Sequence, residues 1–149
     1  MNLVHALKEI NKKKQPKIIA PENSNPRLEE LFDMLDRAAK ENSVINSSYL
    51  CRGIGKTTAL ATIAYRLQAE KENFRIVIPT QRQDWIYRMS GIDSRNISTV
   101  NLRTFKQSLK GLSPSTIIFD EISSENYETL IKEDVLSSKH KVMGFIREK

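Results

Sequence analysis

The sequence predicts an α/β fold in which helices cover both faces of a mostly parallel sheet of about five strands, preceded by N-terminal helices. Two observations lead to this fold class. Short apolar runs such as "FRIVIPT" (74–80) and "STIIFDE" (115–121) are typical of strands buried on both faces. Stretches with apolar residues at helical spacing separate these strands, and that alternation is what a parallel sheet requires.

The first long helix is predicted over residues 26–41, where apolar residues recur on one helix face. Those residues are Leu28, Leu31, Leu35 and Ala38. Residues 1–15 are expected to form a short, weakly amphipathic helix, and the prolines of residues 15–26 predict a linker or an extended connection. We therefore divide the chain into an N-terminal appendage, residues 1–25, and one folded domain, residues 26–149.

The remaining elements alternate along the chain. A proline, Pro79, is expected to end the strand that begins at residue 74, and Gly91 to close the helix that follows it. Further strands are predicted over residues 43–51, 97–102 and 140–148, and further helices over residues 56–72, 81–91, 103–111 and 126–136.

Length and composition fit one soluble globular domain. The chain has 149 residues, of which 39% are hydrophobic and 28% charged, and no apolar run approaches the roughly 20 residues that span a bilayer. The N-terminus places its charges after a short apolar patch, the reverse of a secretory signal. The single cysteine, Cys51, excludes an intramolecular disulfide, so we expect a cytoplasmic protein.

The net charge of +6 permits contact with nucleic acid. Much of the positive charge lies between residues 75 and 110, where only Asp84 and Asp93 oppose it. The basic residues there are Arg75, Arg82, Arg88, Arg95, Arg103, Lys106 and Lys110. This stretch predicts either a nucleic-acid surface or a set of solvated helix faces.

The segment "RGIGKTT" (52–58), at the start of a predicted helix, has the features of a phosphate-binding loop. The general pattern begins with a glycine, but Leu50 stands at that position. Gly53 and Gly55 allow the backbone to approach an anion, and its N–H groups would point at the phosphates of ATP. The residues expected to bind the nucleotide are Arg52, Gly53, Ile54, Gly55, Lys56, Thr57 and Thr58. A chance glycine-lysine turn is the alternative.

Within this loop, Lys56 is expected to reach the β- and γ-phosphates and Thr57 to bind Mg²⁺. A second segment, "STIIFDEIS", is an apolar strand that ends in two adjacent acids. Asp120 is expected to help hold Mg²⁺, and Glu121 to act as the base or to orient the water that attacks the γ-phosphate. An acidic turn after a buried strand is the alternative interpretation.

Together, "CRGIGKTTA" and "STIIFDEIS" resemble the ATPase domains of phage DNA-packaging motors and the large subunits of terminases, which are P-loop NTPases with a catalytic glutamate. They resemble more loosely the first RecA-like lobe of superfamily 1 and 2 helicases. In these families an arginine precedes the second half of the loop and the first glycine is often replaced. Arg52 stands at that position, and the resemblance implies that it stabilises charge on the γ-phosphate.

The resemblance covers residues 44 to about 147 and implies a three-layer α/β/α sandwich that binds ATP and Mg²⁺. It also implies an ATP hydrolase that works with nucleic acid, DNA being favoured, in a bacterial cell or a phage-infected host. A homo-oligomer or a partner motor subunit is the expected assembly. The segment "IVIPTQRQ" resembles a strand that contacts nucleic acid in helicase lobes and nominates Gln81, Arg82 and Gln83. Trp85 and Tyr87 either stack on bases or form a half-buried aromatic pair.

The sequence also departs from this pattern. The families place a polar residue that senses the γ-phosphate at the end of the strand after the acidic motif, where this chain has Ile146 and Arg147. From this sequence we expect neither a nuclease domain nor a second lobe. A nucleotide-binding regulatory or adaptor module with little or no hydrolysis, acting beside a larger motor, is therefore the alternative to an ATPase. A small-molecule kinase fits less well, because only Arg147 lies where its arginine-rich lid is expected.

Overall fold

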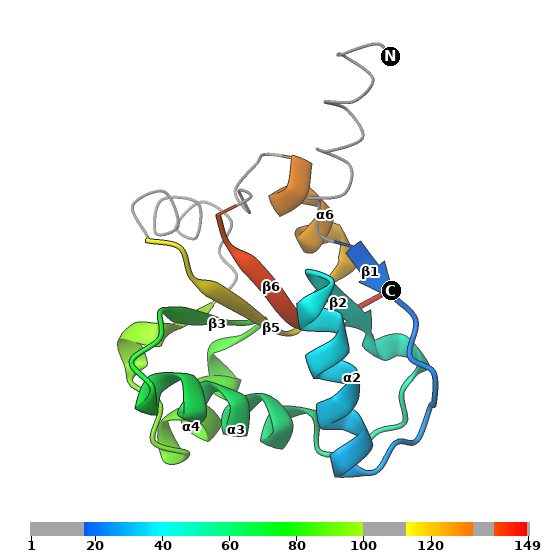
Figure 1. Cartoon of the computed structure of the whole chain (residues 1–149), viewed down its shortest axis with the longest axis horizontal. Coiled ribbons are helices and arrows are strands. Elements are labelled where there is room, and N and C mark those ends of the chain that lie inside the picture. Colours follow the sequence, from blue (N-terminus) through cyan, green and yellow to red (C-terminus); the bar gives the residue numbers. More distant parts are fainter. Residues whose placement is uncertain (1–16, 100–112, 133–138, 149) are drawn as a thin grey trace.

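A computed structural model of the chain describes residues 17–99, 113–132 and 139–148 (Figure 1). Its strands are β1 (Lys17–Ile19), β2 (Ser43–Asn46), β3 (Phe74–Ile78), β4 (Ile97–Thr99), β5 (Thr116–Ser123) and β6 (Lys141–Arg147). Its α-helices are α2 (Leu28–Lys40), α3 (Lys56–Ala69), α4 (Asp84–Met89) and α6 (Ser124–Lys132). Short 3-10 helices cover Ser47–Tyr49, Gln81–Gln83 and Ser94–Asn96. The helices predicted over residues 1–15 and 103–111 lie outside the described residues.

The strands form one six-stranded sheet in the order β1-β2-β6-β5-β3-β4, and every pair is parallel. The α/β class is therefore confirmed, but the expected number of strands was too small. The additional strand is β1, which pairs in register with β2 at the edge of the sheet. The described part of the N-terminal appendage is thus hydrogen-bonded to the sheet rather than standing apart from it.

Helices lie on both faces of the sheet, as in Figure 1, where α6 is separated from α2 and α3 by the strands. Residues of α2, α3 and α4 form one buried core with side chains such as Ile76, Ile118 and Phe145. On the opposite face, Tyr127 and Leu130 of α6 form a second core with Phe119 and neighbouring strand residues. This arrangement is compatible with a three-layer α/β/α sandwich.

Helix α2 confirms the apolar face read from the sequence. Leu31, Leu35 and Ala38 are completely buried, and burial of one such leucine is worth about 1.5–3 kcal/mol. The helix begins at Leu28, two residues later than expected, and its N-cap is Arg27, which makes no side-chain capping bond. Tertiary packing of this face, rather than capping, therefore holds the helix in place.

The connections place two loops at the carboxyl edge of the sheet. After β2 the chain crosses to β3 through α3, which belongs to the α2–α3–α4 core, whereas after β5 it crosses to β6 through α6 on the other face. Loops that leave neighbouring parts of a parallel sheet toward opposite faces open a crevice outside the strand ends. The segments that carry Lys56 and Asp120 both meet this edge.

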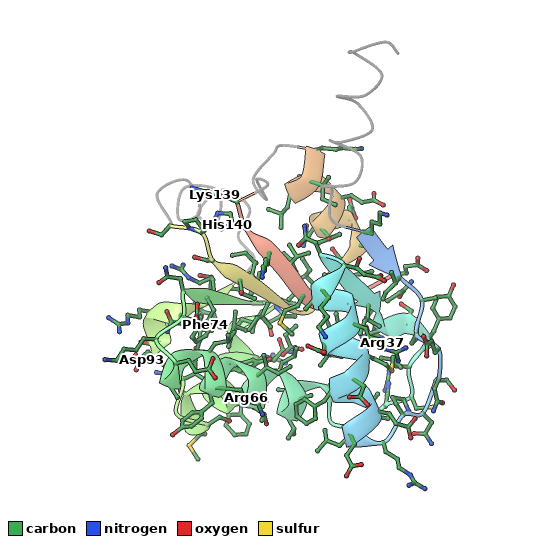
Figure 2. All side chains as sticks on the ribbon, in the orientation of Figure 1. Arg37, Arg66, Phe74, Asp93, Lys139 and His140 are labelled. Carbon is green, nitrogen blue, oxygen red and sulfur yellow. The ribbon has the colours of Figure 1, made fainter. Side chains whose placement is uncertain are left out.

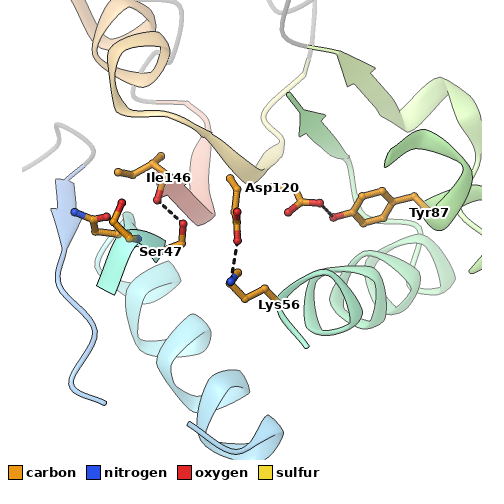
Figure 3. A network of polar contacts seen from close by, with 8 residues as sticks. Ser47, Lys56, Tyr87, Asp120 and Ile146 are labelled. Carbon is orange, nitrogen blue, oxygen red and sulfur yellow. Dashed lines mark hydrogen bonds and ion pairs between the residues drawn. The ribbon is translucent and has the colours of Figure 1, made fainter. Parts of the chain in front are cut away.

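The strand before the glycine-containing loop is shorter than predicted: β2 ends at Asn46, not at residue 51. The Asn46 side chain accepts a hydrogen bond from the Ser48 backbone N–H and starts a 3-10 turn. The Ser47 hydroxyl donates to the backbone carbonyl of Ile146 at 3.0 Å, a contact drawn in Figure 3. The turn at Asn46 and the bond from Ser47 to the end of β6 together lead the chain out of the sheet before it reaches Leu50.

Candidate functional site

The loop before α3 has the backbone that close approach to an anion requires. Gly55 is the N-cap of α3 with a φ of 90°, in the left-handed region that favours glycine, and Gly53 has a φ of 75°. The loop is braced from one side, because the Cys51 N–H donates to the carbonyl of Ser24 at 2.7 Å. The first turn of α3, with its free N–H groups, therefore follows a glycine backbone that is held in place by the rest of the chain.

The first turn of α3 differs from those of the other described α-helices. Helices α2, α4 and α6 each carry an acidic residue in the first turn, which favours their positive N-terminal ends. Helix α3 carries none, and its N-cap glycine has no side chain to satisfy the free N–H groups. A helix end with unsatisfied N–H groups and no acid in its first turn suits an anionic ligand.

The replaced glycine at residue 50 causes no conflict in the structure. Leu50 has a φ of −101° and a ψ of 144°, an extended conformation that any residue adopts. Its side chain is 9% exposed and belongs to the core beneath α2 and α3. The position needs an apolar side chain rather than the conformational freedom of glycine.

Strand β5 carries a bulge at Glu121. Asp120 pairs with Phe145 and Ile122 with Ile146, so Glu121 is an extra residue without a partner in β6. Its φ is 54°, an uncommon value for a residue with a side chain. In a regular strand adjacent residues point to opposite faces, and the bulge removes that restriction for the two acids.

As a result, Glu121 contacts the lysine of the loop. Lys56 Nζ lies 3.0 Å from Glu121 Oε1, and the two side chains are 15% and 24% exposed (Figure 3). An ion pair this sheltered is weakly screened by solvent. The two sequence motifs, predicted separately, therefore meet in one site.

Asp120 lies beside this pair and is 2% exposed. The Tyr87 hydroxyl donates a hydrogen bond of 2.6 Å to Asp120 Oδ2, and Thr57 lies close enough to this carboxylate to lower its pKa. Burial raises the pKa of Asp120 above its usual range, while the bond from Tyr87 opposes that rise. Burial and the nearby Asp120 charge raise the pKa of Tyr87 as well, so its hydroxyl stays protonated and can donate.

The site therefore combines a cation, two carboxylates, a hydroxyl and the free N–H groups of a helix end. In the described parts of the chain, no group of three or more His, Cys, Asp and Glu side chains is placed to hold a metal. Magnesium does not require such a cage, because it is usually held by one or two carboxylates together with waters and substrate phosphates. Asp120 and Thr57 supply protein oxygens of this type.

The other predicted nucleotide-binding residues contribute less to this cluster. Arg52 and Thr58 are exposed, and Arg52 makes no hydrogen bond or ion pair with another described residue. The side chain of Ile54 packs against the core, so only its backbone is free to face a ligand. The role expected of Arg52 stays a prediction.

The residues predicted to contact nucleic acid follow β3, and this strand also ends at the carboxyl edge of the sheet. Gln81 and Arg82 are exposed, and Gln83 is half-buried. The two aromatic residues do not form a pair: Trp85 is 59% exposed, whereas Tyr87 is completely buried. Only Trp85 is placed to stack on a base, and Tyr87 belongs to the Asp120 site, which the sequence did not indicate.

Several of the basic residues that predicted a nucleic-acid surface have partners within the chain. Arg75 donates to the Ser98 hydroxyl, Arg88 pairs with Asp84 of the same helix, and Arg95 pairs with Asp93. Residues 103, 106 and 110 lie outside the described residues. Arg88 and Arg95 are exposed as well, but among the described arginines of this stretch only Arg82 has no ion pair or side-chain hydrogen bond with another described residue.

Strand β6 lies between β2 and β5. Its carboxyl end is where the resembling families carry a polar residue that senses the γ-phosphate. Phe145, which pairs with both Ile45 and Asp120, packs in the α2–α3–α4 core. Ile146 is buried on the other face, and Arg147 is exposed. Next to the acidic pair, β6 therefore presents apolar side chains.

A second buried titratable group lies far from this site. His140, at the amino end of β6, is 3% exposed and accepts a hydrogen bond from the Ser115 N–H through Nδ1. Burial lowers its pKa below the usual value. Figure 2 shows it beside Lys139, at the amino end of β6.

Comparisons of the chain with protein-family models, curated proteins and solved structures found no match. Within the described residues, none of the helices combines the length and the apolar character needed to cross a membrane.

Proposed function

We propose that this chain binds Mg-ATP at the Lys56 site and hydrolyses it, acting on or with nucleic acid. The observation that carries the proposal is the meeting of two independent motifs. Lys56 at the start of α3 and Glu121 after β5 lie 3.0 Å apart, with Asp120 and Thr57 beside them. A chance glycine-lysine turn and an unrelated acidic turn have no reason to meet in this way.

The triphosphate of ATP would be held by the loop and by the start of α3. The N–H groups of the first turn supply hydrogen-bond donors, and the positive end of the helix favours the negative charge. Lys56 supplies a mobile ammonium group for the β- and γ-phosphates. The absence of acid from the first turn of α3 supports this assignment, because an acid there would repel the phosphates.

Thr57 and Asp120 are the residues that would hold Mg²⁺, which neutralises charge on the transferred phosphate when it is bound. Asp120 accepts a hydrogen bond from Tyr87, and the charge of Lys56 favours its ionised form. Asp120 is almost inaccessible to bulk solvent, so few waters would compete with it for a cation bound at the loop.

Glu121 would orient the attacking water and accept its proton. Its carboxylate is paired with Lys56 at 3.0 Å, which places it next to the group proposed to meet the γ-phosphate.

The nucleic-acid part of the proposal has narrower support. It rests on the resemblance to packaging motors and helicases and on the exposed Gln81, Arg82 and Trp85 next to the site's edge of the sheet. Single-stranded nucleic acid is commonly held by such combinations of a stacking aromatic and nearby cations.

A regulatory nucleotide-binding module is the second candidate. It is favoured by the end of β6, where the apolar Phe145 and Ile146 stand in place of the polar sensor of the resembling families. It is also favoured by the exposure of Arg52, which has no side-chain partner among the described residues. This candidate requires nucleotide binding but not turnover.

Phosphate release from ATP, measured with and without single- and double-stranded DNA, distinguishes the two candidates. For an ATPase, Glu121→Gln is expected to retain Mg-ATP binding and to lose turnover by about 10²–10⁴-fold, the usual contribution of a general base. Binding without release by the wild-type chain, with or without DNA, would establish the regulatory module instead. A DNA affinity that is independent of salt would argue against phosphate-backbone contacts.

A further inference from the structure

Tyr87 is a buried polar residue that the proposed reaction does not by itself require. Its side chain is completely buried within the α2–α3–α4 core, yet its hydroxyl ends on Asp120 Oδ2 at 2.6 Å (Figure 3). The two residues are 33 positions apart in the chain and come from α4 and β5. A distance of 2.5–2.7 Å is typical of a hydroxyl that donates to an ionised carboxylate.

A second buried tyrosine shows what a purely space-filling role looks like in this chain. Tyr127 of α6 is also completely buried and packs edge-to-face on Phe119, with ring centres 5.4 Å apart. Its hydroxyl has no hydrogen-bond partner among the described residues. The two tyrosines flank β5 from opposite faces, and only Tyr87 meets a carboxylate.

We propose that Tyr87 is a positioning residue, which holds the Asp120 carboxylate in the orientation that receives Mg²⁺. This inference rests on the proposed function of the site. The hydroxyl engages one oxygen of Asp120 at 2.6 Å and so restricts rotation of the carboxylate. Hydrogen bonds that orient a metal-binding carboxylate typically affect metal affinity by about 10–100-fold when they are lost.

The geometry also explains why a tyrosine suits this position. Asp120 is 2% exposed, so water cannot easily satisfy the oxygen that faces the core. A phenol reaches it from α4, across the core, without introducing a second charge. Because the ring is rigid and packed in the core, its hydroxyl holds the carboxylate at a fixed position relative to α4.

The test measures equilibrium binding of a fluorescent ATP analogue to the full chain as MgCl₂ is varied. Tyr87→Phe keeps the ring and removes the hydroxyl, and Tyr127→Phe is the matched control for loss of a buried hydroxyl. We expect Tyr87→Phe to raise the Mg²⁺ concentration needed for half-maximal enhancement of binding roughly 10-fold. Without Mg²⁺ its affinity for the analogue should stay within about 2-fold of the wild type, and Tyr127→Phe should match the wild type throughout.

Asp120→Asn provides the second background. If Tyr87 acts through Asp120, adding Tyr87→Phe to Asp120→Asn should change the Mg²⁺ dependence no further, a result that a general loss of packing would not produce. Circular dichroism confirms that each variant is folded at the assay temperature. An unchanged Mg²⁺ dependence in Tyr87→Phe, or an equal shift in Tyr127→Phe, would overturn the positioning role alone. Absence of Mg²⁺-dependent binding by the wild-type chain would overturn the proposed function as well.

Discussion

At Glu121 the backbone has a φ of 54° inside a strand, although the residue carries a long side chain. Such conformations cost about 1–3 kcal/mol and persist where the surrounding structure imposes them. Here the strained bulge brings the Glu121 carboxylate to Lys56, within reach of the same loop that Asp120 faces. The strain is consistent with a side chain placed for chemistry rather than for stability.

Replacing Glu121 by glycine is therefore expected to stabilise the nucleotide-free chain relative to Glu121→Gln. Both variants lose the charge that pairs with Lys56, but only glycine adopts the left-handed conformation without strain. The expected difference in the free energy of unfolding is about 1 kcal/mol in favour of the glycine variant. Urea denaturation of the two variants measures it, and a glutamine variant as stable as the glycine variant would show that the bulge is not strained.

The residues of the site were predictable to different degrees. Lys56, Thr57, Asp120 and Glu121 follow from local patterns, because a phosphate loop and an acidic strand end are each encoded in a few adjacent residues. Tyr87 could not be assigned in this way, since its role depends on a contact with Asp120 from a distant segment. The bulge at Glu121 was equally hidden, because it is defined by the pairing of β5 with β6.

Among the elements, strands β5 and β6 make the closest approach near the site. Gly144 of β6 pairs with Phe119, the residue before Asp120, and has a φ of 112°. A Cβ added at Gly144 would lie 2.2 Å from the carbonyl oxygen of Phe119. The close packing of these two strands thus depends on glycine and helps to set the position of Asp120.

Gly144→Ala is expected to destabilise the chain by about 3 kcal/mol or more, because the new methyl group forces the two backbones apart. Gly53→Ala is the matched control. That position also has a positive φ, but nothing lies within 4 Å of an added Cβ, so the expected cost is only about 1 kcal/mol. Thermal unfolding of both variants provides the comparison, and equal midpoints would contradict the close approach of β5 and β6.

The positions of most described elements followed from the sequence, because buried strands and amphipathic helices have clear apolar patterns. Helix α2 and strands β3 and β5 are examples. The end of β2 did not follow, because Ser47 and Ser48 turn the chain by bonding to the end of β6. Strand β1 was missed because three residues among prolines carry no strand pattern of their own.

For the whole molecule, the sequence predicted a parallel α/β sheet but not the order of its strands. The order places β6 between β2 and β5, so the two motifs approach each other across the carboxyl end of an intervening strand. The long side chains of Lys56 and Glu121 meet there at 3.0 Å.

The distribution of charge over the molecule weakens the argument that the net positive charge alone indicates a nucleic-acid surface. Arg88 and Arg95 are engaged with acids from their own segments, and exposed ion pairs of this kind contribute little to stability. The nucleic-acid part of the proposal consequently depends on local residues, Arg82 and Trp85 above all, and not on the overall excess of +6.

Equilibrium binding of a fluorescent ATP analogue, in the presence of Mg²⁺, tests the phosphate site most directly. Lys56→Ala is compared with the wild-type chain and with Lys40→Ala, which removes an exposed lysine of α2 that pairs with Asp36. Loss of charge-assisted bonds to phosphate is worth about 1.5–3 kcal/mol, so Lys56→Ala should bind roughly 10–150-fold more weakly while Lys40→Ala binds like the wild type. Equal affinity of the wild-type chain and Lys56→Ala would contradict the account.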